Sequence, residues 1–166
     1  MRLQAVTEQD VEQARLWRNE NLVPYRTPFF LTEEMQKEFY LNVVCNRKAD
    51  HRYYSVYDGD KFIALIGLVN ISWENRNAEI SIVVNPKFKH HGYGRKSLRL
   101  LLSQGFNSLN LENIYGESYS CNADIEFWIK TIKEYDLKYT SLPARKFANG
   151  SYHDSIYFNF NRGNLK

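Results

Sequence analysis

The stretch from Ala78 to Leu101 reads A-E-I-S-I-V-V-N-P-K-F-K-H-H-G-Y-G-R-K-S-L-R-L-L. Its first part, up to Val84, alternates in polarity and is rich in β-branched residues, which is typical of a strand. An Asn-Pro pair ends this strand, a basic segment with Gly92 and Gly94 follows, and leucines then recur at helical spacing. We therefore expect a strand, a glycine loop and a helix in this order. A helix entered through glycines directs unpaired backbone N–H groups at one point, where an anion can bind.

Outside this stretch, strand and helix patterns follow one another without repeats or linkers. The expected strands cover residues 2–6, 52–57, 62–71, 79–84, 113–120, 137–147 and 153–160, and the expected helices follow Thr7, follow Thr32, and cover 97–109 and 123–133. The sequence predicts an α/β fold with a mixed, mostly antiparallel, twisted sheet of about seven strands, flanked by about four helices. A chain of 166 residues is most simply one domain, over residues 1–166.

The first two helices have N-capping residues, Thr7 and Thr32, and a proline-containing loop, residues 21–30, separates them. Their periodicity predicts one buried apolar face on each helix. These faces are expected at Val11, Ala14, Leu16 and Trp17 in the first helix, and at Met35, Phe39, Val43 and Tyr40 in the second.

Composition excludes several classes of protein. A formal net charge of +3 is too small for a general nucleic-acid binder, although the basic stretch 87–99 leaves weak nucleic-acid binding open. Cys45 and Cys121 form no Cys-x-x-Cys pair, which argues against a metal site or a disulfide framework. The chain starts without an apolar signal core, and its longest apolar stretch, residues 62–69, is too short to span a bilayer. We expect a reduced, cytoplasmic protein without metal or membrane contact, and homodimer formation is left open.

The glycine loop is surrounded by cations that favour a phosphate ligand: Lys87, Lys89, Arg95, Lys96 and Arg99. A Walker loop does not fit, because Gly94 is followed by Arg-Lys without the required spacing. A dinucleotide fingerprint requires a third glycine, and Ser97 stands at that position. The segment can also be an ordinary strand-to-helix turn on a solvated basic face.

The residues from Val83 to Pro86, followed by Lys89-His90-His91-Gly92-Tyr93-Gly94, resemble the central motif of the GNAT superfamily of N-acetyltransferases. That motif is Arg or Gln, two residues, Gly, one residue, and Gly or Ala, and its backbone N–H groups hold the pyrophosphate of acetyl-CoA. Lys89 departs from Arg or Gln but keeps a donor. The resemblance implies that the cofactor is bound by Val83, Val84, Lys89, His91, Gly92, Tyr93, Gly94, Arg95, Lys96 and Asn122.

The resemblance covers most of the chain. The segment from Leu16 to Asn19 and the loop after it look like the opening of two GNAT branches, which acetylate ribosomal-protein N-termini and nucleotide-linked amino sugars. Residues 119–122, Tyr-Ser-Cys-Asn, are similar to a later motif in which the Asn contacts the cofactor, and residues 149–154 also look like these branches. The resemblance implies a GNAT-like fold and an acetyl-CoA-dependent N-acetyltransferase.

For the chemistry, the resemblance implies that an amine attacks the thioester and that amides near Val83 and Val84 stabilise the oxyanion. A base is useful because an amine is mostly protonated at neutral pH. Glu79 is the first candidate and Glu117 the second, although either can be an ordinary strand residue. Many relatives use a Tyr seven residues after the motif Asn to protonate the thiolate. Position 129 is Ile here, so Tyr119 or Tyr135 is the alternative acid, and Tyr119 is counted among the catalytic candidates.

The acceptor amine is expected between the loop 21–30 and the last hairpin, where Arg18, Tyr25, Arg26 and Phe30 are the candidate contacts. Arg binds anions, and Tyr and Phe stack on rings, so a small molecule such as a nucleotide-linked amino sugar or a modified nucleoside fits this composition. Two alternatives stay open: acetylation of protein N-termini, and a module that binds acetyl-CoA with little turnover.

Overall fold

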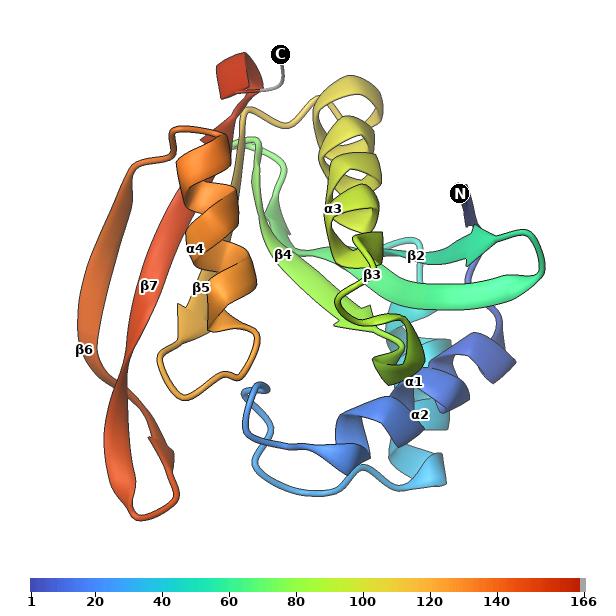
Figure 1. The fold of residues 1–166 in the computed structure, drawn as a ribbon. Coiled ribbons are helices and arrows are strands. Elements are labelled where there is room, and N and C mark those ends of the chain that lie inside the picture. The colour runs from blue at the N-terminus through green and yellow to red at the C-terminus, as the bar shows by residue number, and fades with distance from the viewer. Residues whose placement is uncertain (165–166) are drawn as a thin grey trace.

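The computed structural model describes residues 1–164 and contains a seven-stranded sheet in the order β1-β2-β3-β4-β5-β7-β6 (Figure 1). The strands are β1 (Arg2–Gln4), β2 (Arg52–Asp58), β3 (Lys61–Ser72), β4 (Asn77–Val84), β5 (Asn113–Tyr119), β6 (Tyr139–Ala148) and β7 (Ser151–Asn161). The helices are α1 (Glu8–Glu20), α2 (Glu33–Phe39), α3 (Tyr93–Ser103) and α4 (Ile125–Glu134). Only β4 and β5 pair in parallel; the other pairs are antiparallel. The expected α/β class and mostly antiparallel sheet are confirmed.

Hydrophobic clusters cover both faces of the sheet. Successive side chains of a strand point to opposite faces, so Leu65 and Ile66 of β3 belong to different clusters. Ile66 lies in the larger cluster, which contains the buried leucines of α3. Leu65 packs with Ala14 and Trp17 of α1. The helices α3 and α1 therefore lie on opposite faces of the sheet.

Strands β4 and β5 separate after a short paired region. They pair only at Asn77–Glu79 of β4, opposite Asn113–Tyr115 of β5. Beyond this point β4 continues to pair with β3 as far as Val84, and β5 continues to pair with β7 as far as Tyr119. Figure 1 shows the two strands diverging, with the start of α3 beside the far end of β4. The sheet therefore contains a V-shaped gap between β4 and β5, while each of them stays paired with its other neighbour.

The helix α3 begins four residues earlier than the sequence predicts, at Tyr93 instead of Ser97. Its N-cap is Gly92, whose φ of 78° lies in the left-handed region that glycine adopts without steric cost. The leucine periodicity locates the buried face and not the first turn, which carries Tyr, Gly, Arg and Lys. The last part of the expected helix is a π-helical turn, Gln104–Ser108.

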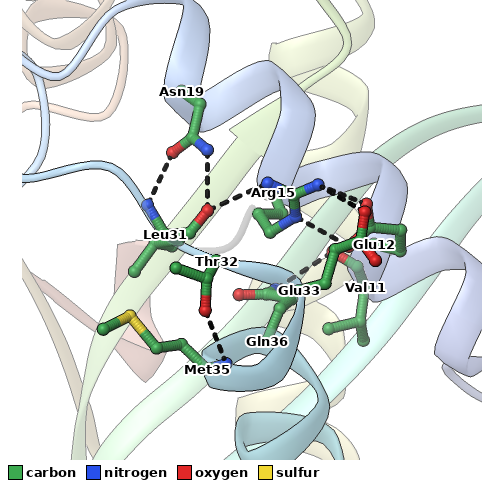
Figure 2. A network of polar contacts seen from close by, with 9 residues as sticks. All are labelled: Val11, Glu12, Arg15, Asn19, Leu31, Thr32, Glu33, Met35 and Gln36. Carbon is green, nitrogen blue, oxygen red and sulfur yellow. Dashed lines mark hydrogen bonds and ion pairs between the residues drawn. The ribbon is translucent and has the colours of Figure 1, made fainter.

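The predicted buried faces of the first two helices are partly wrong. Leu16 and Met35 are each 45% exposed, whereas Val11, Ala14 and Trp17 are buried. In α2 the buried residue is Gln36, because its amide Nε2 donates to the carbonyl of Val11 at 3.0 Å (Figure 2). Phe39, Tyr40 and Val43 of the predicted face are half-buried, with Phe39 against the Tyr53 ring, so only Met35 departs from it.

The ends of the loop between α1 and α2 are fixed by further polar contacts. Asn19 accepts the N–H of Leu31 at 3.0 Å and donates to its carbonyl at 2.9 Å. Arg15 donates to the same carbonyl at 2.9 Å and pairs with Glu12. Figure 2 shows these contacts converging on Leu31, immediately before the Thr32 cap of α2. The loop therefore leaves and rejoins the helices at fixed positions.

Candidate functional site

The glycine loop is open on the side where a ligand would approach. A Cβ added at Gly92 would meet no heavy atom within 4 Å, and one added at Gly94 would meet the ring of Phe127 at 3.6 Å. The first N–H groups of a helix have no acceptor within the helix, so the amides of Tyr93, Gly94 and Arg95 are without a partner in α3. The backbone at the start of α3 therefore fits a diphosphate.

Most cationic side chains around this loop have partners within the protein. Lys89 pairs with Asp124 at 2.7 Å, and Arg95 and Arg99 both pair with Glu134. Lys96 lies over the ring of Tyr93, 5.7 Å from its centre. Two of the other expected contacts bond to main-chain and neighbouring groups: His91 Nδ1 lies 2.6 Å from the carbonyl oxygen of Lys89, and the Tyr93 hydroxyl donates to Asp58 at 3.1 Å. Three of the five cations around the loop are thus paired with carboxylates of the chain itself.

Alternate backbone groups of β4 point into the gap. Asn85 donates its N–H to Ile63 of β3 at 2.9 Å. Backbone groups of alternate residues in an antiparallel strand bond to the same neighbouring strand, so the N–H of Val83 also points to β3. The N–H groups of Ile82 and Val84 therefore face β5 across the gap, and the expected role of Val84 has a donor in the right direction. Val83 is 8% exposed and packs in the cluster around α1.

Asn122 stands between the end of β5 and the start of α4. Its Nδ2 donates to Ser118 at 3.3 Å, and its Oδ1 accepts the N–H of Asp124 at 2.9 Å. Because Asp124 also pairs with Lys89, this short segment connects α4 to the glycine loop. Asn122 therefore orders the wall of the gap opposite β4.

Two carboxylates lie beside the gap and share one guanidinium. Arg26 Nη2 lies 2.5 Å from Glu79 Oε1 and 3.1 Å from Glu117 Oε2, and Nη1 donates to Glu79 Oε2 at 3.1 Å. Asn70 donates to the same Glu79 oxygen at 3.0 Å. Glu117 also accepts from Arg145 at 3.0 Å and from Ser155 at 2.7 Å. The structure thus brings together three residues from the α1–α2 loop, β4 and β5 that the sequence singles out.

These contacts determine the charge state of the cluster. Burial by itself raises the pKa of the Glu117 carboxyl, but the hydrogen bond from Ser155 and the charges of Arg145 and Arg26 outweigh it and hold the pKa below its ordinary value. Burial opposes the charge of Arg26, and the neighbouring Glu79 outweighs that effect, so the pKa of Arg26 is raised. The cluster is therefore ionised at neutral pH at both Arg26 and Glu117.

A cleft of about 490 Å³ opens at this cluster. It is lined by Arg26, Pro28, Glu117, Tyr119, Arg145, Lys146 and Phe147. Lys146 is only 9% exposed; its Nζ lies 5.4 Å from the centre of the Tyr119 ring and donates to the carbonyl of Tyr25. The cleft is bounded by the α1–α2 loop and the β6–β7 hairpin, where the acceptor is expected.

Of the four expected acceptor contacts, only Arg26 lines this cleft. The guanidinium of Arg18 lies 5.0 Å from the centre of the Tyr25 ring and contacts Thr27 at 3.4 Å. Burial lowers the pKa of Arg18 and raises that of Tyr25 to about 12, because neither group is well solvated as an ion. These two residues therefore support the loop from within. Phe30 is 68% exposed and does not line the cleft.

The sequence does not single out several residues that shape the cleft. Arg145, Lys146 and Ser155 come from the last strand pair, and Asn70 comes from β3. Strand alternation places Arg145 and Lys146 on opposite faces, so no periodic signal marks them as a pair. A bulge between Leu142 and Lys146 interrupts the register with β7 there, and that irregularity has no local sequence signature.

The family model described as an acetyltransferase (GNAT) domain matches residues 1–126. This chain belongs to the GNAT acetyltransferase family. GNAT domains take their acetyl group from acetyl-CoA, and the open helix start and the split sheet described above fit that donor. The resemblance seen in the glycine motif is confirmed.

Named relatives of this GNAT chain are polyamine enzymes. Spermidine N(1)-acetyltransferase of Vibrio cholerae serotype O1 is 28% identical over 100 residues, which cover 58% of this chain and 56% of that protein. The protein of the same name from Escherichia coli (strain K12) is 31% identical over 68 residues, which cover 41% of this chain and 36% of that protein. The chain thus matches less than two thirds of the length of these curated relatives.

Solved structures of low identity share the whole GNAT fold. Spermidine N-acetyltransferase from Vibrio cholerae in complex with CoA and spermine has a TM-score of 0.86 at 22% identity, covering 99% of this chain and 98% of that chain. The dodecameric structure of that enzyme in an intermediate state has a TM-score of 0.82 at 21% identity, covering 98% and 94%.

Neither a membrane-crossing helix nor a cluster of metal ligands is present in residues 1–164. No helix in this range is long and apolar enough to cross a membrane. Within the same part of the chain, no group of three or more His, Cys, Asp or Glu side chains is arranged to hold a metal ion. Cys45 and Cys121 are both free thiols.

Proposed function

We propose that this GNAT domain transfers the acetyl group of acetyl-CoA to a primary amine in the cleft beside Glu79 and Glu117. The observation that carries this proposal is the position of the gap between β4 and β5. The glycine loop enters α3 on one face of the sheet, and the carboxylates lie on the other face with Arg26. A donor bound at the loop reaches the carboxylates only through this gap.

Each part of the site has one task in the proposed reaction. The amides of Tyr93, Gly94 and Arg95 hold the diphosphate, and the N–H groups of Ile82 and Val84 bind the carbonyl oxygen as it becomes negative. Bound acetyl-CoA supplies the thioester carbon that the amine attacks. Glu79 removes the amine proton, directly or through a water molecule.

After the C–N bond forms, the C–S bond breaks and its electron pair stays on sulfur. The leaving group is therefore a thiolate. Tyr119 lies in the cleft wall. We propose that its hydroxyl donates the proton that the thiolate takes up. A thiol pKa near 8.5 makes this acid helpful and not obligatory near neutral pH. The absence of Tyr at position 129 is therefore compatible with turnover.

For the acceptor we propose a polyamine. The supporting observation is that both curated relatives named above are spermidine acetyltransferases, and that one structural neighbour holds spermine. The amino-sugar and nucleoside classes, which the sequence favours through Arg18 and Tyr25, lose that support because these residues pack under the loop and do not line the cleft. The N-terminal amine of a peptide is the alternative acceptor against which the polyamines are tested.

A thiol-release assay tests this function. Purified protein with acetyl-CoA is given spermidine, spermine, a nucleotide-linked amino sugar, or a peptide with a free N-terminus. We expect free CoA with the polyamines well above the rate without acceptor. Release with the amino sugar or peptide alone would exclude the polyamine proposal.

A domain that binds acetyl-CoA without turnover is the second candidate, and Ile at position 129 is the observation that favours it. Calorimetry with acetyl-CoA separates the two. Binding in the micromolar range without thiol release from any acceptor would support the second candidate.

We also propose that the chain self-associates, since a structural neighbour is described as dodecameric. The edge strand β6 and its partner β7 expose Tyr139, Phe147 and Tyr152, each at least 60% accessible. Light scattering during size-exclusion chromatography measures the molar mass in solution. A mass of one chain at all concentrations would rule out self-association.

A further inference from the structure

The guanidinium of Arg26 occupies the place where a cationic acceptor would have to bind. It lies 2.5 Å from Glu79 and 3.1 Å from Glu117, the two carboxylates at the gap. An acceptor amine enters as an ammonium and must reach a base here before it can attack. While Arg26 is bound, both oxygens of Glu79 are engaged, Oε1 by Arg26 and Oε2 by Arg26 and Asn70.

The charges of the cleft oppose a polycation. Arg26, Arg145 and Lys146 line it, and the anions near them are Glu117 and the adjacent Glu79. A second or third positive charge brought by a polyamine therefore meets net repulsion as long as Arg26 stays in place. Release of Arg26 from the carboxylates removes one cation from the cleft and exposes one anion.

The burial of the partners shows which group can leave. The side chain of Arg26 is 54% exposed, whereas the side chains of Glu79 and Glu117 are 10% and 7% exposed. Arg26 can therefore turn into solvent, and the carboxylates cannot. Glu117 keeps Arg145 and Ser155 when Arg26 leaves, but Glu79 keeps only Asn70. The vacated position is thus next to Glu79, the proposed base.

The backbone around Arg26 is held, so its side chain is the moving part. Lys146 donates to the main-chain carbonyl of Tyr25, and the Arg18 side chain contacts the hydroxyl of Thr27. The far end of the loop is fixed at Leu31 by Asn19. No displacement of the loop is needed to free Glu79.

We propose that Arg26 sets acceptor specificity by competing internally with the acceptor ammonium for Glu79. This inference rests on the proposed N-acetyltransferase function and adds to it a residue that weakens binding of cationic acceptors. An acceptor with a single ammonium takes the place of the Arg26 guanidinium at Glu79 and adds no further charge. A polyamine also places further positive charges beside Arg145 and Lys146. Removal of Arg26 therefore favours the acceptors that carry more charge.

The test compares Arg26→Gln with wild type on a monoamine, putrescine, spermidine and spermine. We expect Arg26→Gln to lower the KM for spermidine by about two- to fivefold, the range for a partly exposed ion pair, with a smaller change for the monoamine. The KM for acetyl-CoA should not move. A rise in the acceptor KM, or an equal change for every acceptor, would overturn the proposal, because Arg26 would then position the carboxylates or bind the acceptor itself.

Arg145→Gln is the matched variant, because it removes a cation from the same cleft without freeing Glu79. A gain in spermidine affinity as large as that of Arg26→Gln would show a general charge effect and overturn the competition. Arg26→Lys keeps the charge without the bidentate contact and should fall between wild type and Arg26→Gln; thermal melting curves confirm that each variant folds.

Calorimetry of spermidine with CoA-loaded protein gives an answer that is independent of turnover. Tighter binding by Arg26→Gln than by wild type supports the inference, and equal or weaker binding overturns it. Failure of the proposed function looks different: neither wild type nor any variant releases thiol with any amine. The two failures are therefore distinguishable.

Discussion

At the scale of single residues, the roles in the site depend on how many hydrogen-bond donors each carboxylate has. Glu79 and Glu117 are both satisfied by Arg26, but Glu117 has two further donors and Glu79 has one. This asymmetry gives the two carboxylates different tasks. Glu117 is a fixed anchor of the cleft wall, and Glu79 is the one that can exchange its partner for a substrate.

Glu79→Gln tests that division. The amide keeps the shape and can still bond to Asn70, but it accepts no proton. We expect turnover to fall on the order of a hundredfold, typical for loss of a general base, while calorimetry shows acetyl-CoA affinity unchanged. Turnover within twofold of wild type would remove Glu79 from the proton path.

Glu117→Gln should destabilise the fold, and the effect should depend on pH. Because the pKa of Glu117 is lowered in the folded protein, its contribution is fully present above the ordinary carboxylate pKa and is lost as pH falls through the lowered value. Its cationic partners are half exposed, so we expect a loss of about 1–2 kcal/mol at pH 7. Urea melts of wild type and variant should converge in acid; a gap that widens in acid would contradict the shift.

At the scale of elements, the sequence predicts the sheet well and the helix ends poorly. All seven expected strands are present, because alternation and turn residues are local signals. The start of α3 was missed since Gly92 acts through its positive φ and not through polarity. The buried Gln36 was missed because its partner, the Val11 carbonyl, is distant in sequence. Partners that are distant in sequence also limit what can be predicted of the site. The sequence singles out Glu79, Glu117 and Arg26, but it predicts neither the ion pairs between them nor the part of Lys146 in the cleft.

Gly92→Glu tests the loop, and Gly150→Glu is its matched control. Both glycines have a φ of 78° and open space around the added Cβ, so both variants pay a similar backbone strain of about 1 kcal/mol. Gly150 lies in the turn between β6 and β7, and Figure 1 shows that turn far from α3. Only Gly92→Glu should abolish acetyl-CoA binding in calorimetry. Equal losses of affinity would mean that the loop has no special role.

Asn19→Ala tests whether α1 fixes the loop. The variant leaves the N–H and the carbonyl of Leu31 without their amide partner, and Arg15 then holds that carbonyl alone. We expect a loss of about 1–3 kcal/mol in stability and faster hydrogen exchange at residues 21–31. Exchange at wild-type rates would show that the loop is held elsewhere.

At the scale of the whole molecule, topology creates the site and side chains specify it. The crossover from β4 through α3 to β5 joins parallel strands, which pair over three residues and then diverge. A solved neighbour shares this fold at a TM-score of 0.86 with only 22% identity. The divergence of the two strands follows the crossover in this fold, and Arg26, Arg145 and Lys146 supply the charges around it in this chain.

A crystal structure with bound acetyl-CoA is the most direct measurement of this account. It should show diphosphate oxygens within hydrogen-bond distance of the amides of Tyr93, Gly94 and Arg95 and the thioester between β4 and β5, pointing at Glu79. A coenzyme bound elsewhere, or a diphosphate held by side chains while those amides bond within the protein, would contradict it.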